Sequence, residues 1–210
     1  MKIIDISISV NNRISLWPGN QGLKLKRISD MKKGQAYNET SIDMNVHIGT
    51  HIDAPRHFIF SGKTIDQMAL DAFIGTTFVA YLPKVKTISS ADLEKVRIPK
   101  SVKRILFKTS NSLLWEKRVS KFEKEYVGIT PDAAMWLSKR NFKLVGVDYL
   151  SVAKFDEAPE VHKILLKKGI ALLEGINLSG VRPGKYELIC LPIKIAGLEA
   201  SSTRAVLIKK

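Results

Sequence analysis

The first clear pattern along the chain is an alternation of apolar and polar residues near the N-terminus. In Ile4-Asp5-Ile6-Ser7-Ile8-Ser9-Val10, every second residue is apolar. A period of two is typical of a strand that buries one face. We therefore expect a strand over residues 4–10. A turn should follow at Trp17-Pro18-Gly19, because proline and glycine favour turns.

Short apolar runs farther along the chain predict more strands. Residues 42–60 mix β-branched residues with Gly49 and Pro55, which indicates a strand joined to a loop. Glu174 stands directly after one of the apolar runs. The remaining predicted strands cover residues 73–82, 104–108, 144–148, 170–173 and 188–195.

Helix signals lie between these strands. Residues 130–140 begin with Thr-Pro-Asp, which supplies an N-cap, a proline at the first helical position and an acidic first turn. Ser89 and Asp92 are spaced as a capping box for a short helix. Pro159 opens a third helix, which Gly169 closes. The pattern predicts a mixed α/β fold.

Length and composition agree with one globular domain over residues 1–210, with 45% hydrophobic and 26% charged residues. No apolar run approaches the roughly 20 residues that span a bilayer. Asp5 comes too early for a signal peptide. The single cysteine, Cys190, cannot form an intrachain disulfide, which agrees with a reducing compartment. We expect a cytoplasmic protein without membrane contact.

The net charge of +14 raises the question of an anionic partner. Nucleic-acid-binding proteins usually concentrate positive charge on one element and place aromatic residues between the charges. Here the lysines and arginines form short groups along the whole chain. A solvated basic surface is therefore the favoured interpretation, and we do not expect nucleic acid as a partner. The alternative is a basic nucleic-acid-associated protein that uses a metal only for its structure.

Three of the four histidines lie in one short segment, together with an aspartate. His47, His51, Asp53 and His57 all occupy odd-numbered positions, and on extended backbone such side chains share a face. Two imidazoles and a carboxylate would then converge on one point, as a metal such as zinc requires. Gly49 leaves no side chain between the first two imidazoles.

Two common zinc motifs do not fit this segment. A zincin helix has a glutamate directly after its first histidine, whereas Ile48 occupies that position here. Gly49 and Pro55 also disfavour a helix. A zinc finger would need more cysteines than the one present.

The fourth histidine and one glutamate are candidates for a second metal. His162 lies in the helix that Pro159 opens, and Glu174 follows a strand. Each would be a weak ligand candidate alone. A histidine in a helix usually packs in the core or faces solvent, and a glutamate at the end of a strand is usually solvated. Two metals about 3.5–4 Å apart need a bridging carboxylate and ligands on both sides. Asp53 could bridge them, with His162 and Glu174 completing the second site.

The pattern His47-x-Gly49-Thr50-His51-x-Asp53-x-Pro55-x-His57 resembles the signature of the metal-dependent cyclase family. The best-known member of this family is bacterial kynurenine formamidase, which hydrolyses N-formylkynurenine to kynurenine and formate. Shorter similarities extend along nearly the whole chain. They are Asp5-Ile6-Ser7, Trp17-Pro18-Gly19, Val145-Gly146-Val147-Asp148, Leu173-Glu174-Gly175, Leu191-Pro192 and Arg204-Ala205-Val206.

The resemblance implies roles for the matching residues. His57 would transfer the proton in hydrolysis, although a role as a third imidazole ligand stays open. Trp17 would pack against an aromatic substrate. The implied metal ligands are His47, His51, Asp53, His162 and Glu174.

The resemblance also implies a fold, cofactors and partners. The fold would be a swivelling β/β/α arrangement with a small barrel-like sheet flanked by helices. Two Zn²⁺ ions per chain are expected, with Mn²⁺ possible. Metal-bound hydroxide would attack a small aromatic amide, and the chain would form a homodimer or homotetramer.

One departure from the formamidases bears on the substrate. Ser201-Ser202 stands where they have Ser-Pro, which predicts a changed loop near the site. The resemblance therefore indicates the class of reaction, hydrolysis, more clearly than it indicates the substrate. The alternatives are a family hydrolase that acts on another cyclic amide or acyl compound, and a member without activity that binds a small aromatic acid.

Overall fold

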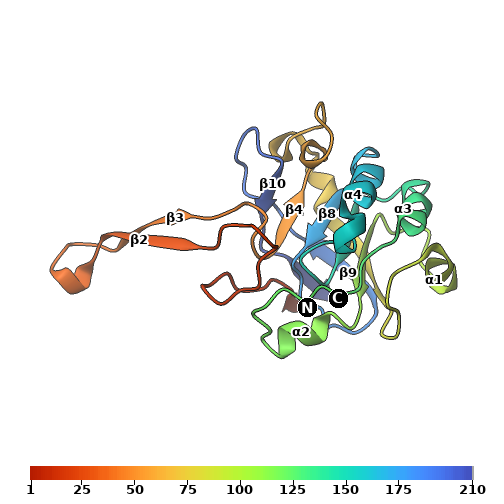
Figure 1. Ribbon diagram of the computed structural model, residues 1–210, viewed down its shortest axis with the longest axis horizontal. Helices are drawn as coiled ribbons and strands as arrows, with labels where there is room; N and C mark the ends of the chain where they lie inside the picture. The colour runs from red at the N-terminus through yellow and green to blue at the C-terminus, as the bar shows by residue number, and fades with distance from the viewer. Residues whose placement is uncertain (210) are drawn as a thin grey trace.

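The computed structural model describes residues 1–209 and is built around one large, curled sheet (Figure 1). The strands of this sheet are β1 (Lys2–Asp5), β4 (His51–Asp53), β5 (Ile74–Tyr81), β6 (Arg104–Lys108), β7 (Leu144–Val147), β8 (Ala171–Glu174), β9 (Gly184–Ile189), β10 (Ala200–Ser202) and β11 (Val206–Lys209). Their order is β1-β11-β9-β5-β6-β7-β8-β4-β10. Strands β5 to β8 run parallel, and the flanking pairs are antiparallel.

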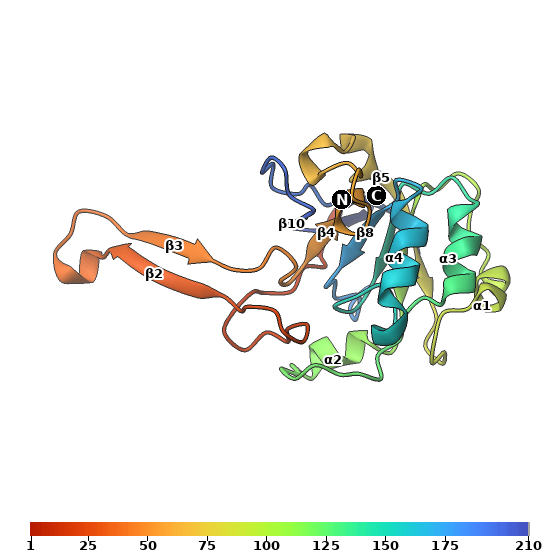
Figure 2. The ribbon, with the colours of Figure 1, turned by 45° about the horizontal axis from the view of Figure 1, so that its top comes forward.

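Helices α1 (Ser90–Lys95), α3 (Pro131–Ser138) and α4 (Ala158–Leu166) cover one face of this sheet, and α2 (Ser112–Glu116) lies apart from them (Figure 2). Single 3-10 turns are η1 (Met31–Lys33), η2 (Pro55–His57), η3 (Ile65–Gln67), η4 (Leu70–Ala72) and η5 (Phe155–Glu157). Helices α1, α3 and α4 lie side by side, with α4 next to β8 (Figure 2). Among residues 1–209, no helix combines the length and apolar character needed to cross a membrane.

Apolar side chains fill both faces of the sheet. On β6, Ile105 and Phe107 pack in the core under the helices, whereas Leu106 packs in the core on the opposite face. All three are fully buried. A central parallel strand that is covered on both sides has this continuous apolar sequence. The helices on one face and the apolar core on the other therefore hold β6, β7 and β8 in place, and β8 pairs with β4.

Most predicted elements are confirmed, with ends that shift by a few residues. The strand over residues 104–108 and the short helix with its Ser89–Asp92 capping box are present as expected. The helices predicted over 130–140 and 159–169 correspond to α3 and α4. Their caps and the apolar runs between them are local signals, which explains the agreement.

Two predicted strands are wrong in their extent. The first strand is β1, and it ends at Asp5 because the Asp5 carboxylate accepts a hydrogen bond from Ser7 N and turns the backbone. The strand expected over 188–195 is β9, which begins at Gly184 and ends at Ile189. Pro192 lies just beyond and has no N–H to donate to a neighbouring strand.

A long hairpin that the hydrophobic pattern did not predict projects from the body of the molecule (Figures 1 and 2). It consists of β2 (Lys24–Ser29) and β3 (Glu39–Asp43), joined through η1. Almost all its residues are exposed, including the cross-strand pair Leu25 and Ile42, at 60% and 61%. We call this hairpin the arm. A two-stranded hairpin has little stability alone.

Gly175 controls how closely β8 approaches the turn before β4. Its φ is +64°, and a Cβ atom there would overlap the carbonyl group of Gly49. Gly175→Ala should therefore lower the free energy of unfolding by about 3 kcal/mol, from backbone strain and the displaced turn. Urea unfolding measures this change.

Gly180→Ala is the matched control for this substitution. A Cβ atom at Gly180 would meet no atom within 4 Å, so we expect a change within about 0.5 kcal/mol. Equal stabilities of the two variants would contradict the account of Gly175.

Candidate metal centre

Strand β4 supplies the centre of the site. His51 and Asp53 are two positions apart on this strand, and both side chains are buried on the same face. Strand β4 lies between β8 and β10, so its backbone is paired on both sides. The strand argument from the sequence is confirmed for these two residues.

His47 and His57 do not lie on the extended backbone that was expected, although both reach the cluster. His47 lies in a turn before β4, in which Gly49 has a φ of +69°. His57 ends η2, which Pro55 begins. The ring centroids of His47 and His57 are 4.2 Å apart. A turn and a 3-10 helix, not extended backbone, therefore bring these imidazoles together.

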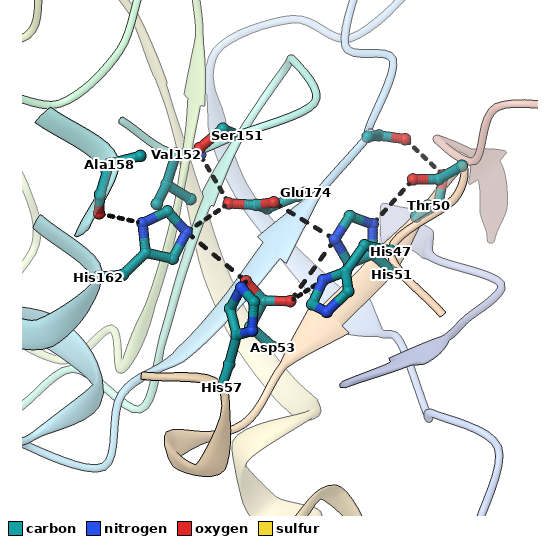
Figure 3. Close-up of polar contacts among 12 residues, drawn as sticks. His47, Thr50, His51, Asp53, His57, Ser151, Val152, Ala158, His162 and Glu174 are labelled. Atoms are coloured by element: carbon teal, nitrogen blue, oxygen red, sulfur yellow. Dashed lines mark hydrogen bonds and ion pairs between the residues drawn. The ribbon is translucent and has the colours of Figure 1, made fainter. Parts of the chain in front are cut away.

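The pairing of β4 with β8 adds Glu174. His51 lies directly opposite Glu174 in the register, and His51 Nε2 is 3.3 Å from Glu174 Oε2 (Figure 3). Val152 N donates to Glu174 Oε1 at 2.7 Å and fixes the carboxylate. Helix α4 brings His162, whose Nε2 lies 3.2 Å from Glu174 Oε1 and 3.6 Å from Asp53 Oδ2. All four groups are buried.

The donor atoms form two groups that could each hold a metal ion. One group is His47, His51 and Asp53, and the other is Asp53, His162 and Glu174. Within each group, the donor atoms all lie within 4.8 Å of one another. Asp53 belongs to both, so its two carboxylate oxygens serve the two sides of the cluster. The five residues expected as ligands are thus brought together.

The hydrogen bonding of these atoms fits a bound cation. His51 Nε2 and both oxygens of Asp53 are buried and have no hydrogen-bond partner of good geometry among the described residues. His47 Nδ1 lies 3.0 Å from Asp53 Oδ1, but a suitably oriented hydrogen bond is lacking. Buried polar atoms without partners are rare. A divalent ion would satisfy them, and imidazole with carboxylate suits zinc or manganese.

Two of the imidazoles are oriented by backbone carbonyls. His51 Nδ1 lies 3.1 Å from Gly49 O, and His162 Nδ1 lies 2.7 Å from Ala158 O. A carbonyl oxygen only accepts, so in each ring Nδ1 carries the proton and donates. When such a ring is neutral, the lone pair of its Nε2 points into the cluster, as in metal-binding histidines.

The charges in the cluster depend on one another. Burial opposes the ionisation of Asp53, but the facing imidazoles, with His47 first, outweigh it and hold the pKa of Asp53 below its ordinary value. Burial also opposes protonation of His47, and the surrounding carboxylates outweigh it and raise the pKa of His47 to about 8. The carboxylates are thus ionised at neutral pH, the state in which they bind cations.

His57 stands at the edge of the cluster. It belongs to neither ligand group among the described residues, and its Nε2 is 3.9 Å from Asp53 Oδ2. Burial and repulsion from His47 and His162 lower the pKa of His57, and the charge of Asp53 opposes this shift. The side chain remains 27% exposed. A neutral imidazole therefore stands between the buried carboxylate and open space.

A pocket of about 240 Å³ opens onto the cluster and is lined by His47, His57, His162 and Glu174. Trp17 forms part of its wall and stacks against Phe155, with ring centroids 5.0 Å apart. Sequence reasoning missed the other uncharged residues that line this pocket. They are Asn20, Phe58, Leu150, Ser151 and Ala158. Phe58, Asn20 and Ala158 each stand next to a residue that the sequence singled out, namely His57, Gly19 and Pro159.

The Ser201-Ser202 segment is a strand rather than the predicted loop. It lies in β10, where Ser201 pairs with Ile52 and Ser202 pairs with His51. The backbone is extended at Ser202, so the absence of a proline there does not alter a turn. The prediction of a loop here is wrong, because no local pattern in this segment indicates its pairing with β4.

Comparisons with known proteins agree with this geometry. The family model described as "Putative cyclase" matches residues 4–154. Cyclase-like protein 1 of Arabidopsis thaliana is 36% identical over 220 residues, which cover 99% of this chain and 85% of the relative. Kynurenine formamidase of Bacillus thuringiensis subsp. konkukian (strain 97-27) is 33% identical over 205 residues, covering 97% and 96%.

A solved structure titled as a potential metal-dependent hydrolase with cyclase activity has the same fold. Its TM-score is 0.83 at 30% identity, and the alignment covers 98% of this chain and 96% of that one. The expected mixed α/β domain with a curled, barrel-like sheet and flanking helices is therefore confirmed. The matched segment contains His47, His51, Asp53 and His57. By family model, relatives and fold, the chain belongs to the cyclase family.

Proposed function

We propose that this protein is a metal-dependent hydrolase that cleaves aryl formamides such as N-formylkynurenine to an arylamine and formate. The observation that carries the proposal is the pair of donor groups that share buried Asp53, beside a pocket with an aromatic wall. Two relatives named as kynurenine formamidases align along nearly the whole chain. An amide hydrolase is the enzyme class that both observations support.

The cofactors we propose are two divalent ions, zinc first and manganese second. His47, His51 and Asp53 would hold one, and Asp53, His162 and Glu174 the other. When bound, such ions lower the pKa of a coordinated water and polarise a carbonyl oxygen. The chain supplies three imidazoles and two carboxylates for them, a mixed donor set that zinc and manganese both accept.

The pocket would bind the substrate through its aromatic part. Trp17 is held by the stacked ring of Phe155, so its position is fixed before a ligand arrives. Phe58 lies across from His162, with ring centroids 4.8 Å apart. A planar aryl group packed against these rings would place its amide carbon beside the buried carboxylates. Rigid aromatic walls give such binding at low entropic cost.

His57 is the residue we propose for proton transfer. Hydrolysis of an aryl formamide adds water across the C–N bond, and the nitrogen must gain a proton because an arylamine leaves poorly as an anion. The lowered pKa of His57 leaves its ring neutral at pH 7, so it can accept a proton from the attacking water. The same ring can then give that proton to the leaving nitrogen. Its position outside both ligand groups supports this role.

The metal assignment predicts different losses from two substitutions. The purified protein should bind two equivalents of zinc, measured by elemental analysis after dialysis. Asp53→Ala should lose both ions, because this carboxylate serves both groups. His162→Ala should lose mainly one. A variant without Asp53 that keeps two ions would disprove the bridge.

The assignment of His57 predicts a separation of metal content from activity. His57→Ala should keep near-normal zinc, while its rate on formanilides falls by about 10²-fold or more. Esters with a good leaving group need less protonation and should lose less. Loss of zinc would instead make His57 a ligand, and unchanged amide turnover would remove its catalytic role.

We propose a second copy of the chain as the macromolecular partner. The arm exposes apolar residues on an element with little support from the body, which is typical of a surface that is buried on association. Light scattering should therefore give two or four times the mass of one chain.

The double substitution Leu25→Lys with Ile42→Lys should shift this mass towards the monomer. Leu113→Lys is the control, because Leu113 is a comparably exposed leucine on α2 rather than on the arm. A monomeric unsubstituted protein would contradict the proposed partner.

A further inference from the structure

The outer nitrogens of the three candidate ligand histidines have different kinds of partner. His51 and His162 both face backbone carbonyls, which belong to the turn before β4 and to α4. These partners are fixed by the fold and cannot be altered by changing a side chain. The orientation of these two rings is therefore built into the backbone.

His47 has a different arrangement. Its Nδ1 faces Asp53 Oδ1 at 3.0 Å, and its Nε2 faces Glu199 Oε1 at 3.5 Å. Of the three ligand histidines, it is the one whose outer nitrogen faces a side chain. The ring also lies in a turn rather than in a strand or helix. Asp53 is thus the carboxylate on the inner side of this ring, and Glu199 is the carboxylate on its outer side.

The sheet places Glu199 beside the outer nitrogen of His47. Glu199 directly precedes β10, and its carbonyl oxygen accepts a hydrogen bond from Ala54 N at 2.8 Å. The next residue, Ala200, is paired with Asp53 in the β10–β4 register. The backbone of Glu199 is thus tied to the end of β4, while its side chain, 39% exposed, reaches the outer edge of the His47 ring.

We propose that Glu199 is a positioning residue that sets the tautomer of His47 for metal binding. A neutral imidazole carries one proton, and the carboxylate of Glu199 favours that proton on Nε2. The lone pair of Nδ1 then points towards Asp53 and the metal position. Carboxylates behind ligating histidines act in this way, and their loss typically costs 10–100-fold in metal affinity.

The geometry gives Glu199 this role rather than that of a ligand. Its contact is with the ring nitrogen farther from Asp53, so the imidazole stands between Glu199 and the buried carboxylate. Glu199 belongs to neither donor group among the residues described. Its influence should therefore be confined to the group of His47, His51 and Asp53. The inference rests on the metal site of the proposed function.

Zinc titration against a chelating dye tests this selectivity on the full-length protein. In Glu199→Ala, one of the two zinc sites should weaken by about 10–100-fold, while the other keeps the affinity of the unsubstituted protein. Glu199→Gln should lose less, because its amide oxygen can still accept from Nε2–H. Glu187→Gln is the matched control, since Glu187 bonds to Thr76 on β5, away from the cluster. It should leave both affinities unchanged.

The tautomer gives a readout that a merely structural role would not change. With ¹⁵N-labelled histidine, the chain gives only four imidazole patterns, and the pattern missing in His47→Gln identifies His47. Zinc-loaded protein should show His47 with its proton on Nε2. In Glu199→Ala this Nε2–H signal should broaden or disappear, whereas the patterns of His51 and His162 should stay the same.

Several outcomes would overturn the inference. Unchanged affinity of both sites in Glu199→Ala would overturn it and leave the proposed function standing. Equal weakening of both sites would show a general structural effect instead of control of His47. A proton on Nδ1 of His47 in the zinc-loaded protein would also overturn it. Failure of the unsubstituted protein to bind zinc would reject the proposed function together with the inference.

Discussion

The buried carboxylate of Asp53 is the group on which the rest of the site depends. A carboxylate inside a sheet, without hydrogen bonds to its oxygens, costs several kcal/mol unless positive charge or a metal lies next to it. Imidazoles from a turn, a strand, a 3-10 helix and an α-helix surround it. The arrangement favours positive charge next to Asp53, which either a protonated His47 or a bound metal cation can supply.

The sheet supplies the precision that this arrangement needs. Strand β8 lies in the register that puts Glu174 opposite His51, and β10 lies in the register that puts Ala200 opposite Asp53. The covered core of β6 and β7 holds β8 from the other side. Glycine at position 175 allows the turn before β4 to approach this strand closely. Mobile loops could not hold the donor atoms within the roughly 0.5 Å that a metal site requires.

Local sequence signals predicted the elements better than their contacts. The spacing of His51 and Asp53 identified a strand face, and the cap at Thr130 identified a helix start. Chemistry alone made His162 and Glu174 candidates for a second metal, and the resemblance supported them. Their meeting could not be predicted from local signals, because it depends on how α4 and β8 pack against β4. The arm was not foreseen because its exposed strands have no buried face, and Glu199 was missed because its role depends on the β10 register.

Anomalous diffraction from crystals of the zinc-loaded protein tests the central claim most directly. The account predicts two zinc peaks about 3.5–4 Å apart, with one oxygen of Asp53 on each ion. His47 and His51 should bind one of them, and His162 and Glu174 the other. A single zinc ion, or two ions of which Asp53 binds only one, would contradict the account.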